Sequence, residues 1–183
     1  MTTIIGIQND YGCLLVADSL VTDDNGRKYS HPEMRKLAER GAFIIAGSGE
    51  VLPCDIIQHI WQPPTVTIKD KKDLYHFMVT KVIPSLRTCL SENGYNFDES
   101  HDKKDGERFH FLIAVNGIIF DIDQELSITL NDSGIYAVGS GGDFALGALH
   151  AGVDAHEAME IASKLSAFTA GPYISKVQSR LIN

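Results

Sequence analysis

The sequence is poor in cysteine and lacks the long apolar runs that would place it in a membrane. Three cysteines in 183 residues, without metal-ligand spacing, exclude a disulfide scaffold and indicate reduced thiols. The longest mostly apolar stretch, Phe109–Phe120, is too short to span a bilayer and is interrupted by His110, Asn116 and Gly117. The first residues contain neither a basic segment nor a cleavage site for a signal peptidase. We therefore expect a cytoplasmic protein without a membrane partner.

A block of basic residues is also missing. The chain has 16 Lys and Arg against 24 Asp and Glu, which gives a net charge of −8. This balance argues against nucleic acid as a partner, because binding to phosphates needs clustered positive charge. The remaining composition, 44% hydrophobic and 22% charged, is that of an ordinary globular protein that can bury a core. Without a linker, repeat or low-complexity segment, we expect a single domain over residues 1–183.

The hydrophobic periodicity predicts strands, two helices, strands, two helices and a final strand. The strongest local signal is Asn116-Gly117, a hairpin turn between two apolar runs. Two helical layers that enclose a stack of two sheets would satisfy this order. Strands are expected at 3–8, 12–17, 42–46, 108–115, 118–122, 126–130, 135–138 and 173–182, short extended pieces within 21–30, and helices at 54–61, 70–93 (kinked at Pro84), 142–150 and from 154.

The start of the chain contains a possible nucleophile. A small second residue allows an aminopeptidase to remove Met1, which would leave Thr2 at the N-terminus. A terminal threonine carries its own base, because its α-amino group has a pKa of about 7.7–8.0 and can accept the hydroxyl proton. Taken alone, however, a Met-Thr start is common and has no functional meaning.

Three later segments could complete a site around Thr2. A lysine such as Lys36, placed beside a terminal threonine, would lower the pKa of its hydroxyl and amine by like-charge repulsion. Asp18, at the end of the second strand, could hold that lysine charged and oriented. The backbone of Ala46–Gly49 could supply the N–H donors of an oxyanion hole. Considered singly, Lys36 is a surface cation and Ala46–Gly49 a glycine turn.

In order and spacing, these segments resemble the proteasome β-subunit family, and among its members the bacterial HslV-type peptidases. The resemblance extends from Thr2 to about Tyr173 and implies an N-terminal nucleophile (Ntn) hydrolase. The implied fold is α+β, with four αββα layers in which two antiparallel sheets lie between helix pairs. It is carried by Thr2-Thr3-Ile4-Ile5, by Asp18, Lys36 and Ala46-Gly47-Ser48-Gly49, and by Ile135-Tyr136-Ala137-Val138-Gly139-Ser140-Gly141-Gly142 with Ala145 and Ala148 in the following helix.

The resemblance also implies a role for each matching residue. Thr2 would be the nucleophile and general base, Lys36 would tune its pKa, and Asp18 would orient Lys36. The amide of Gly49 would stabilise the oxyanion, with Gly47 or Ser48 as alternatives because the interval from Lys36 is short. Thr22 and Gly49 would pair with the substrate backbone, and Gly47 and Ser48 would contact the substrate. Ser140 would support the amine of Thr2, and Thr169 would supply a further supporting hydroxyl. A monovalent cation would lie near Ser163, Ser166 and Thr169.

The implied function is a threonine endopeptidase subunit that acts on polypeptides within a homo-oligomeric ring or stacked rings. It would need no cofactor beyond the possible monovalent cation. The resemblance also implies a separate ATP-dependent unfoldase as a partner. Gly139–Gly142 lacks the lysine of a phosphate-binding loop, so a phosphate site there is a poor interpretation. Two alternatives stay open: an inactive shell or adaptor that keeps Met1, and an amidohydrolase of small amides. A metal site at His101, Asp102 and Asp105 is a weaker reading than an exposed charged loop.

Overall fold

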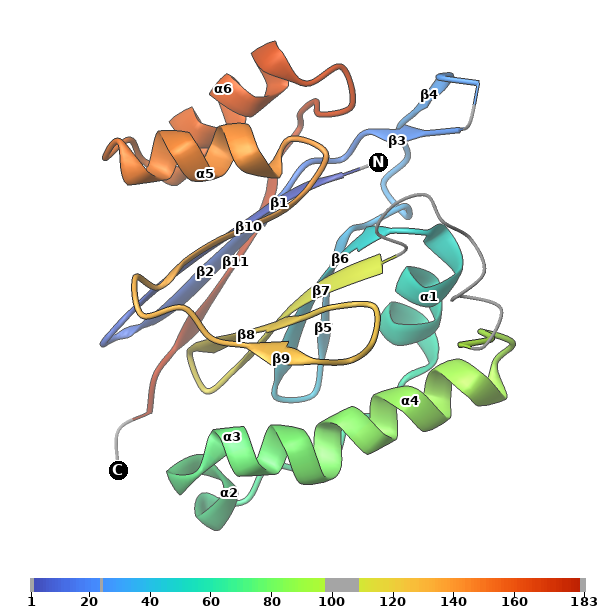
Figure 1. Ribbon diagram of the computed structural model, residues 1–183, viewed down its shortest axis with the longest axis vertical. Coiled ribbons are helices and arrows are strands. Elements are labelled where there is room, and N and C mark those ends of the chain that lie inside the picture. The colour runs from blue at the N-terminus through green and yellow to red at the C-terminus, as the bar shows by residue number, and fades with distance from the viewer. Residues whose placement is uncertain (1, 24, 98–108, 182–183) are drawn as a thin grey trace.

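Two antiparallel sheets lie face to face with helices on both outer sides (Figure 1). The structure is a computed structural model that describes residues 2–23, 25–97 and 109–181. The predicted four-layer αββα arrangement is confirmed. The strand order in the first sheet is β10 (Ile135–Gly139), β1 (Thr3–Asn9), β2 (Gly12–Ala17) and β11 (Ile174–Ser179). The strand order in the second sheet is β5 (Leu37–Arg40), β6 (Phe43–Gly49), β7 (Phe109–Val115), β8 (Ile118–Ile122) and β9 (Ile128–Thr129).

Three apolar layers hold these elements together. Between the sheets, alternate strand residues such as Ile4, Leu15, Ala46 and Leu112 pack with almost no exposure. The outer face of the first sheet is covered by α5 (Gly142–His150) and α6 (Ala155–Leu165). The outer face of the second sheet is covered by α1 (Val51–Asp55), η1 (Ile56–Ile60), α2 (Ile68–Lys72), α3 (Leu74–Phe77), η2 (Met78–Val82) and α4 (Ile83–Glu92).

The long helix expected over 70–93 is interrupted. It begins earlier, with Thr67 and Asp70 forming a capping box, and it breaks at Asp73, whose φ and ψ of −143° and 73° are not helical. Before Pro84, where a kink is expected, the chain forms a wider π-helical turn, η2, immediately preceding α4. A wider turn gives room to the carbonyl that the proline ring would otherwise crowd.

Other boundaries differ from the sequence prediction in ways that matter for the site. The strand expected at 42–46 continues through Gly49, and its edge neighbour β5 was not predicted. The helix expected at 54–61 begins at Val51. The predicted extended pieces within 21–30 are confirmed as the hairpin β3 (Val21–Thr22) and β4 (Lys28–Tyr29). The strand expected at 126–130 is reduced to β9.

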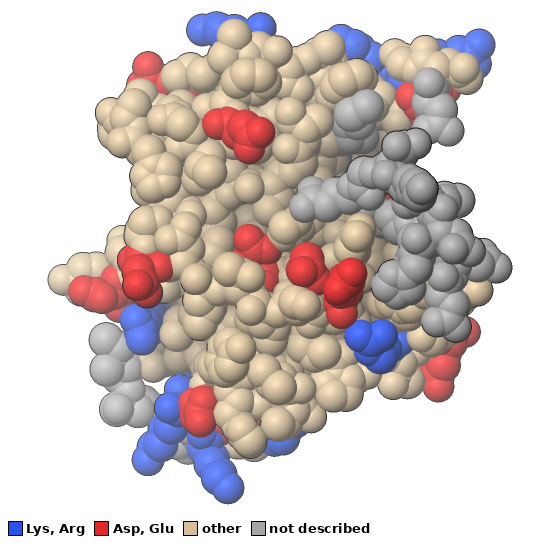
Figure 2. Space-filling view, viewed as in Figure 1, with Lys and Arg blue, Asp and Glu red and all other residues tan. Residues whose placement is uncertain are grey.

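Charged side chains are scattered over a largely uncharged face in the view of Figure 2. Basic residues gather at its lower end, where α2 carries Lys69, Lys71 and Lys72. In the part of the chain that the structure describes, no helix has the length and apolar character needed to cross a membrane. No group of three or more His, Cys, Asp or Glu side chains could hold a metal ion within the same residues, and the weaker metal prediction at His101, Asp102 and Asp105 lies outside them.

Candidate active site

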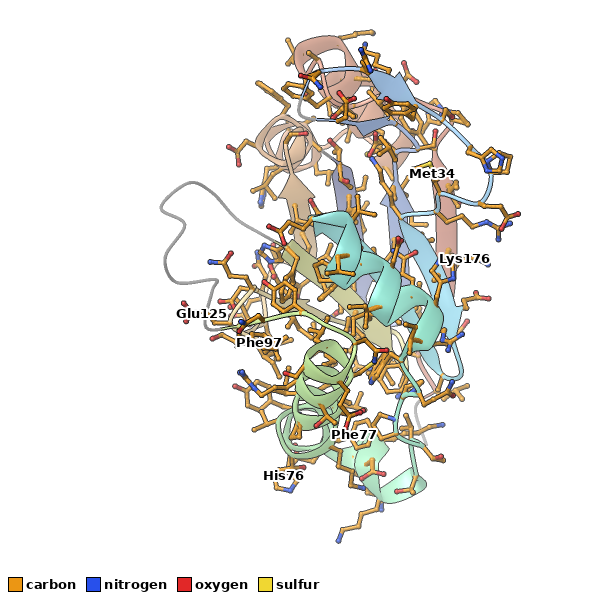
Figure 3. All side chains as sticks on the ribbon, turned by 90° about the vertical axis from the view of Figure 1, so that its right-hand side faces the viewer. Met34, His76, Phe77, Phe97, Glu125 and Lys176 are labelled. Carbon is orange, nitrogen blue, oxygen red and sulfur yellow. The ribbon has the colours of Figure 1, made fainter. Side chains whose placement is uncertain are left out.

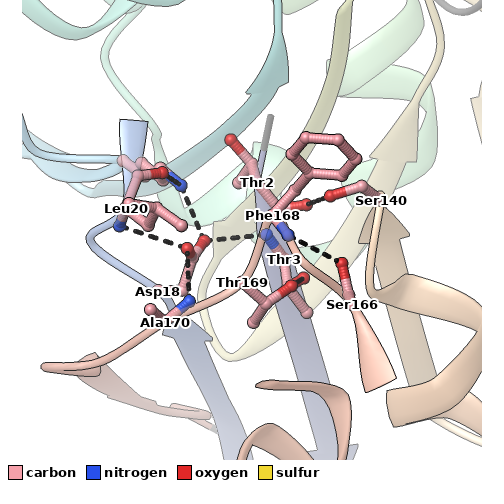
Figure 4. A network of polar contacts seen from close by, with 10 residues as sticks. Thr2, Thr3, Asp18, Leu20, Ser140, Ser166, Phe168, Thr169 and Ala170 are labelled. Atoms are coloured by element: carbon pink, nitrogen blue, oxygen red, sulfur yellow. Dashed lines mark hydrogen bonds and ion pairs between the residues drawn. The ribbon is translucent and has the colours of Figure 1, made fainter. Parts of the chain in front are cut away.

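Asp18 is the buried centre of a polar network at the end of β2 (Figure 4). Its carboxylate is fully buried and accepts four hydrogen bonds. Oδ1 accepts from the Thr3 backbone N–H at 2.8 Å and from Lys36 Nζ at 2.7 Å. Oδ2 accepts from the backbone N–H groups of Leu20 at 3.2 Å and Ala170 at 3.4 Å. One side chain therefore joins the start of β1, the loop after β2, the segment before β5 and the segment before β11.

Lys36 projects its ammonium group into this network just before β5. Its Nζ also donates to the carbonyl of Leu20 at 2.5 Å, and only 7% of the residue is exposed. Burial lowers the pKa of the Lys36 ammonium from its ordinary value of 10.5, and the negative charge of Asp18 offsets part of that effect. The result is a cation that is held in place and has fewer water contacts than a surface lysine.

Thr2 precedes β1 and lies against the glycine-rich turn after β10. Ser140 Oγ donates to the carbonyl oxygen of Thr2 at 3.2 Å. Gly139 has φ of 88°, and a Cβ built there would come within 2.1 Å of that same carbonyl and 2.7 Å of Ser48 Oγ. Only a residue without a side chain permits this approach, so the turn directly fixes the backbone position of Thr2.

The end of β6 brings a second backbone segment to Thr2. The backbone N–H of Gly47 already donates a hydrogen bond to the Lys36 carbonyl oxygen at 3.1 Å, so it is not free to bind a substrate oxygen. Gly49 follows with φ of 102° and is exposed, whereas Ser48 is buried. Of the three residues suggested as oxyanion donors, Gly49 is therefore the one with an exposed backbone at the site.

Two pockets adjoin this arrangement, and Thr2 and Gly49 are the residues that line both. The first pocket has a volume of about 200 Å³, and Met34 on its wall lies near the upper end of α1 in Figure 3. The second has a volume of about 290 Å³. The first pocket is further lined by Val21, Glu33, Met34, Arg35, Lys36, Gly47, Val51, Cys54, Asp55, Gln58 and His59, and the second by Ser48, Phe109, His110, Gly139 and Ser140.

The other predicted site residues lie outside the pockets. Thr22 sits on β3 beside Val21, and it is Val21 that lines the first pocket. Thr169 Oγ1 lies 2.5 Å from Thr3 Oγ1, so its hydroxyl supports the start of β1. Ser163 Oγ donates to the carbonyl of Glu160.

The hydroxyl groups proposed near a cation are each engaged separately. Ser166 Oγ accepts from the backbone N–H of Phe168, while Thr169 is bound to Thr3 and Ser163 to its own helix. The three hydroxyl groups therefore do not converge on one another through these contacts. The cation stays a prediction, and the proposed reaction does not use it. The predicted removal of Met1 concerns a residue outside the described part of the chain.

Sequence reasoning missed a histidine–aspartate pair at the second pocket. His110 Nε2 on β7 pairs with Asp121 Oδ1 on β8. The signal was available, because the Asn116-Gly117 turn fixes the register of this hairpin. That register places Asp121 opposite Leu112, two residues from His110 and on the same face.

Comparison with solved structures identifies the fold. A scan against protein-family models and a search of curated proteins gave no match. Thiobacillus denitrificans BPH in complex with epoxomicin has a TM-score of 0.74 at 23% identity, over 99% of this chain and 100% of that chain. HslV from Trypanosoma brucei gives 0.63 at 20% identity over 98% and 100%, and Anbu from Yersinia bercovieri gives 0.68 at 11% over 97% and 81%. The chain therefore has the proteasome-β-like Ntn-hydrolase fold.

Proposed function

We propose that the protein is a threonine peptidase subunit in which Thr2, freed by removal of Met1, is the nucleophile. The observation that carries this proposal is the Asp18 carboxylate, which binds both the Thr3 amide and the Lys36 ammonium. This contact holds a buried cation in the pocket that Thr2 lines. An activated terminal threonine needs such a neighbour, because the positive charge lowers the pKa values of its hydroxyl and amine.

In the proposed reaction, the Thr2 amine takes the hydroxyl proton as Oγ1 attacks the carbonyl carbon of the scissile peptide. The oxyanion of the tetrahedral intermediate accepts a hydrogen bond from the Gly49 amide. The C–N bond then breaks, and the departing amine takes the proton from the Thr2 ammonium. The acyl half stays on Thr2 as an ester. The free amine activates a water molecule, which hydrolyses the ester and restores Thr2.

Assembly into a homo-oligomeric ring is part of the proposal. Large apolar side chains are exposed on several elements, including Val51 and Leu52 on α1, Leu165 on α6 and Val177 on β11. Val51 and Leu52 are adjacent on α1, and neighbouring exposed apolar side chains are suited to contacts between subunits. A polypeptide substrate and a separate ATP-dependent unfoldase follow from the same hypothesis. Light scattering tests the assembly, and a 20.1 kDa monomer at high concentration would contradict it.

The first test combines intact mass with activity. We expect the purified protein to lack one methionine, to hydrolyse a peptidyl coumarin amide, and to form a covalent adduct with epoxomicin. The Thr2→Ala variant should keep the fold and lose both hydrolysis and adduct formation. Retained Met1 together with absent turnover would favour the inactive shell or adaptor. Turnover of simple amides but not of peptides would favour the small-amide hydrolase.

A further inference from the structure

Gln58 is a buried polar side chain of the first pocket that the proposed reaction does not use. Only 4% of the residue is exposed. Its side-chain amide makes no hydrogen bond within the part of the chain that the structure describes, yet neither amide atom is sealed from solvent. Gln58 lines the first pocket, so the amide opens into that pocket. A ligand with matching hydrogen-bonding groups would satisfy it, because leaving such groups unpaired costs free energy.

The helical segment after Gly49 leads from the proposed reaction site to Gln58. α1 begins just beyond Gly49 and continues into η1, which contains Gln58. The residues of this segment that line the first pocket have the spacing of a single helix face, namely Val51, Cys54, Asp55, Gln58 and His59. The proposed oxyanion donor and the Gln58 amide therefore border one pocket along one helix face.

The first pocket has room for one long side chain. Its volume is about 200 Å³. A cavity of about 150 Å³ accommodates benzene, which has more non-hydrogen atoms than a glutamine side chain. Thr2 and Gln58 border the same pocket, so a side chain next to a bond cut at Thr2 can extend to the Gln58 amide. Its methylene groups would lie against Val21, Val51 and the uncharged thiol of Cys54.

The charges and hydrogen-bonding groups of the pocket favour a neutral amide as the end of that side chain. The charged side chains along the pocket are two of each sign, namely Glu33, Asp55, Arg35 and Lys36. Neither an acidic nor a basic side chain therefore meets charge of the opposite sign alone. A carboxylate only accepts hydrogen bonds and an ammonium only donates them, so each would leave one amide atom of Gln58 unpaired. A second amide can donate to Oε1 and accept from Nε2 at the same time.

We propose that the first pocket binds a glutamine side chain of the polypeptide substrate next to the scissile bond, and that Gln58 determines this specificity. The inference rests on the proposed function and deepens it by naming a substrate class. The glutamine is either the residue that contributes the cleaved carbonyl group or the residue that contributes the departing amine. The test below separates these two positions.

The test uses two series of peptides. Peptidyl coumarin amides vary the residue before the scissile bond, and internally quenched peptides vary the residue after it, with the position of the cut confirmed by mass spectrometry. Each series contains Gln, Glu, Lys or Met, which are similar in length. In one series, the wild-type protein should cleave the Gln peptide with a kcat/KM about tenfold above those of the other three. Gln58→Met keeps the length of the side chain and removes both hydrogen-bonding atoms, so it should bring the Gln-to-Met ratio to about one or below.

A matched control and a binding measurement separate this inference from the proposed function. Gln62→Met makes the same substitution at an exposed glutamine that lines a different pocket, and it should keep the wild-type ratio. In the Thr2→Ala variant, which does not cut the peptides, fluorescence anisotropy should show about tenfold tighter binding of the Gln peptide than of the Met peptide. Adding Gln58→Met should remove that difference.

Each result decides between the two proposals. Peptide turnover without a preference for glutamine in either series, or with a preference that Gln58→Met leaves unchanged, would overturn the role of Gln58 alone. Selective binding of the Gln peptide without turnover by the wild-type protein would support the pocket and contradict the peptidase. Absence of both turnover and selective binding would overturn both proposals.

Discussion

Asp18 and Lys36 form a buried ion pair whose members are held unequally: the carboxylate accepts three backbone N–H groups besides the ammonium. These amides satisfy Asp18 even when the lysine is absent. Lys36, by contrast, relies on the carboxylate for its charge compensation in a site that already disfavours the protonated form. The two residues therefore differ in what their removal does to the fold and to catalysis.

Lys36→Met and Asp18→Asn should separate these two effects. We expect Lys36→Met to cost about 1 kcal/mol in the free energy of unfolding, because Asp18 keeps its amide donors, but to lower kcat/KM by at least about 100-fold. Asp18→Asn should cost about 3 kcal/mol and abolish turnover, because a buried ammonium loses its counter-charge. Urea unfolding and steady-state kinetics measure both quantities. Equal stability losses would contradict the unequal support of the pair.

The pH dependence of activity should reflect the lowered pKa of Lys36. The site needs the protonated ammonium, and burial makes that proton leave at a lower pH than the ordinary 10.5. The alkaline limb of kcat/KM should therefore begin below pH 10.5 in the wild-type protein. Lys36→Arg stays charged throughout this range, so its residual activity should fall at a higher pH or not at all. An identical alkaline limb in both proteins would show that another group controls it.

Gly139→Ala should disturb Thr2 directly. The new methyl group would lie 2.1 Å from the Thr2 carbonyl oxygen at a backbone φ of 88°. We expect a loss of at least about 2 kcal/mol in stability and a loss of turnover. Gly147→Ala on α5 is the matched control, because its methyl group meets no atom within 4 Å. That change should stabilise the protein by about 0.5–1 kcal/mol and leave turnover intact. Thermal unfolding of the two variants would settle the comparison.

Cys54 should be an unreactive thiol despite lining the first pocket. Burial, with a further contribution from Asp55, raises its pKa from 9.0 to about 12. At pH 8 its thiolate fraction is then about a thousandfold smaller than that of an unperturbed thiol. Iodoacetamide should label Cys54 slowly in the native protein and quickly in urea, as measured by peptide mass mapping. Complete labelling of the native protein within minutes would be inconsistent with this environment.

The layers of the fold could be predicted from the sequence, because they rest on local signals. Apolar runs at 3–8 and 12–17 indicated β1 and β2, and the Asn116-Gly117 turn indicated the hairpin of β7 and β8. Thr2, Asp18 and Lys36 were selected by residue type, by order and by the family resemblance, and their catalytic roles stay a prediction. The structure places Lys36 and Thr2 in one pocket and Asp18 in hydrogen-bond contact with Lys36.

Features that depend on pairing between distant segments were missed. β5 is a short edge strand, and the charged residues Glu39 and Arg40 make up half of it, so it lacks the apolar run typical of a strand. It is recognised only through its pairing with β6. The break at Asp73 depends on how the helix must turn to cover the second sheet. To predict the His110–Asp121 pair, the register of the β7–β8 hairpin has to be extended from the turn to the ends of both strands.

The four donors around Asp18 have a consequence for the order of events during synthesis. Thr3 leaves the ribosome well before Ala170, which donates to the same carboxylate. Thr169, whose hydroxyl group is hydrogen-bonded to that of Thr3, is also synthesised long after Thr3. A nascent chain therefore carries Thr2 and Thr3 before the residues that complete the network around Asp18. That network forms only when the polypeptide has folded, and the proposed hydrolysis would begin no earlier.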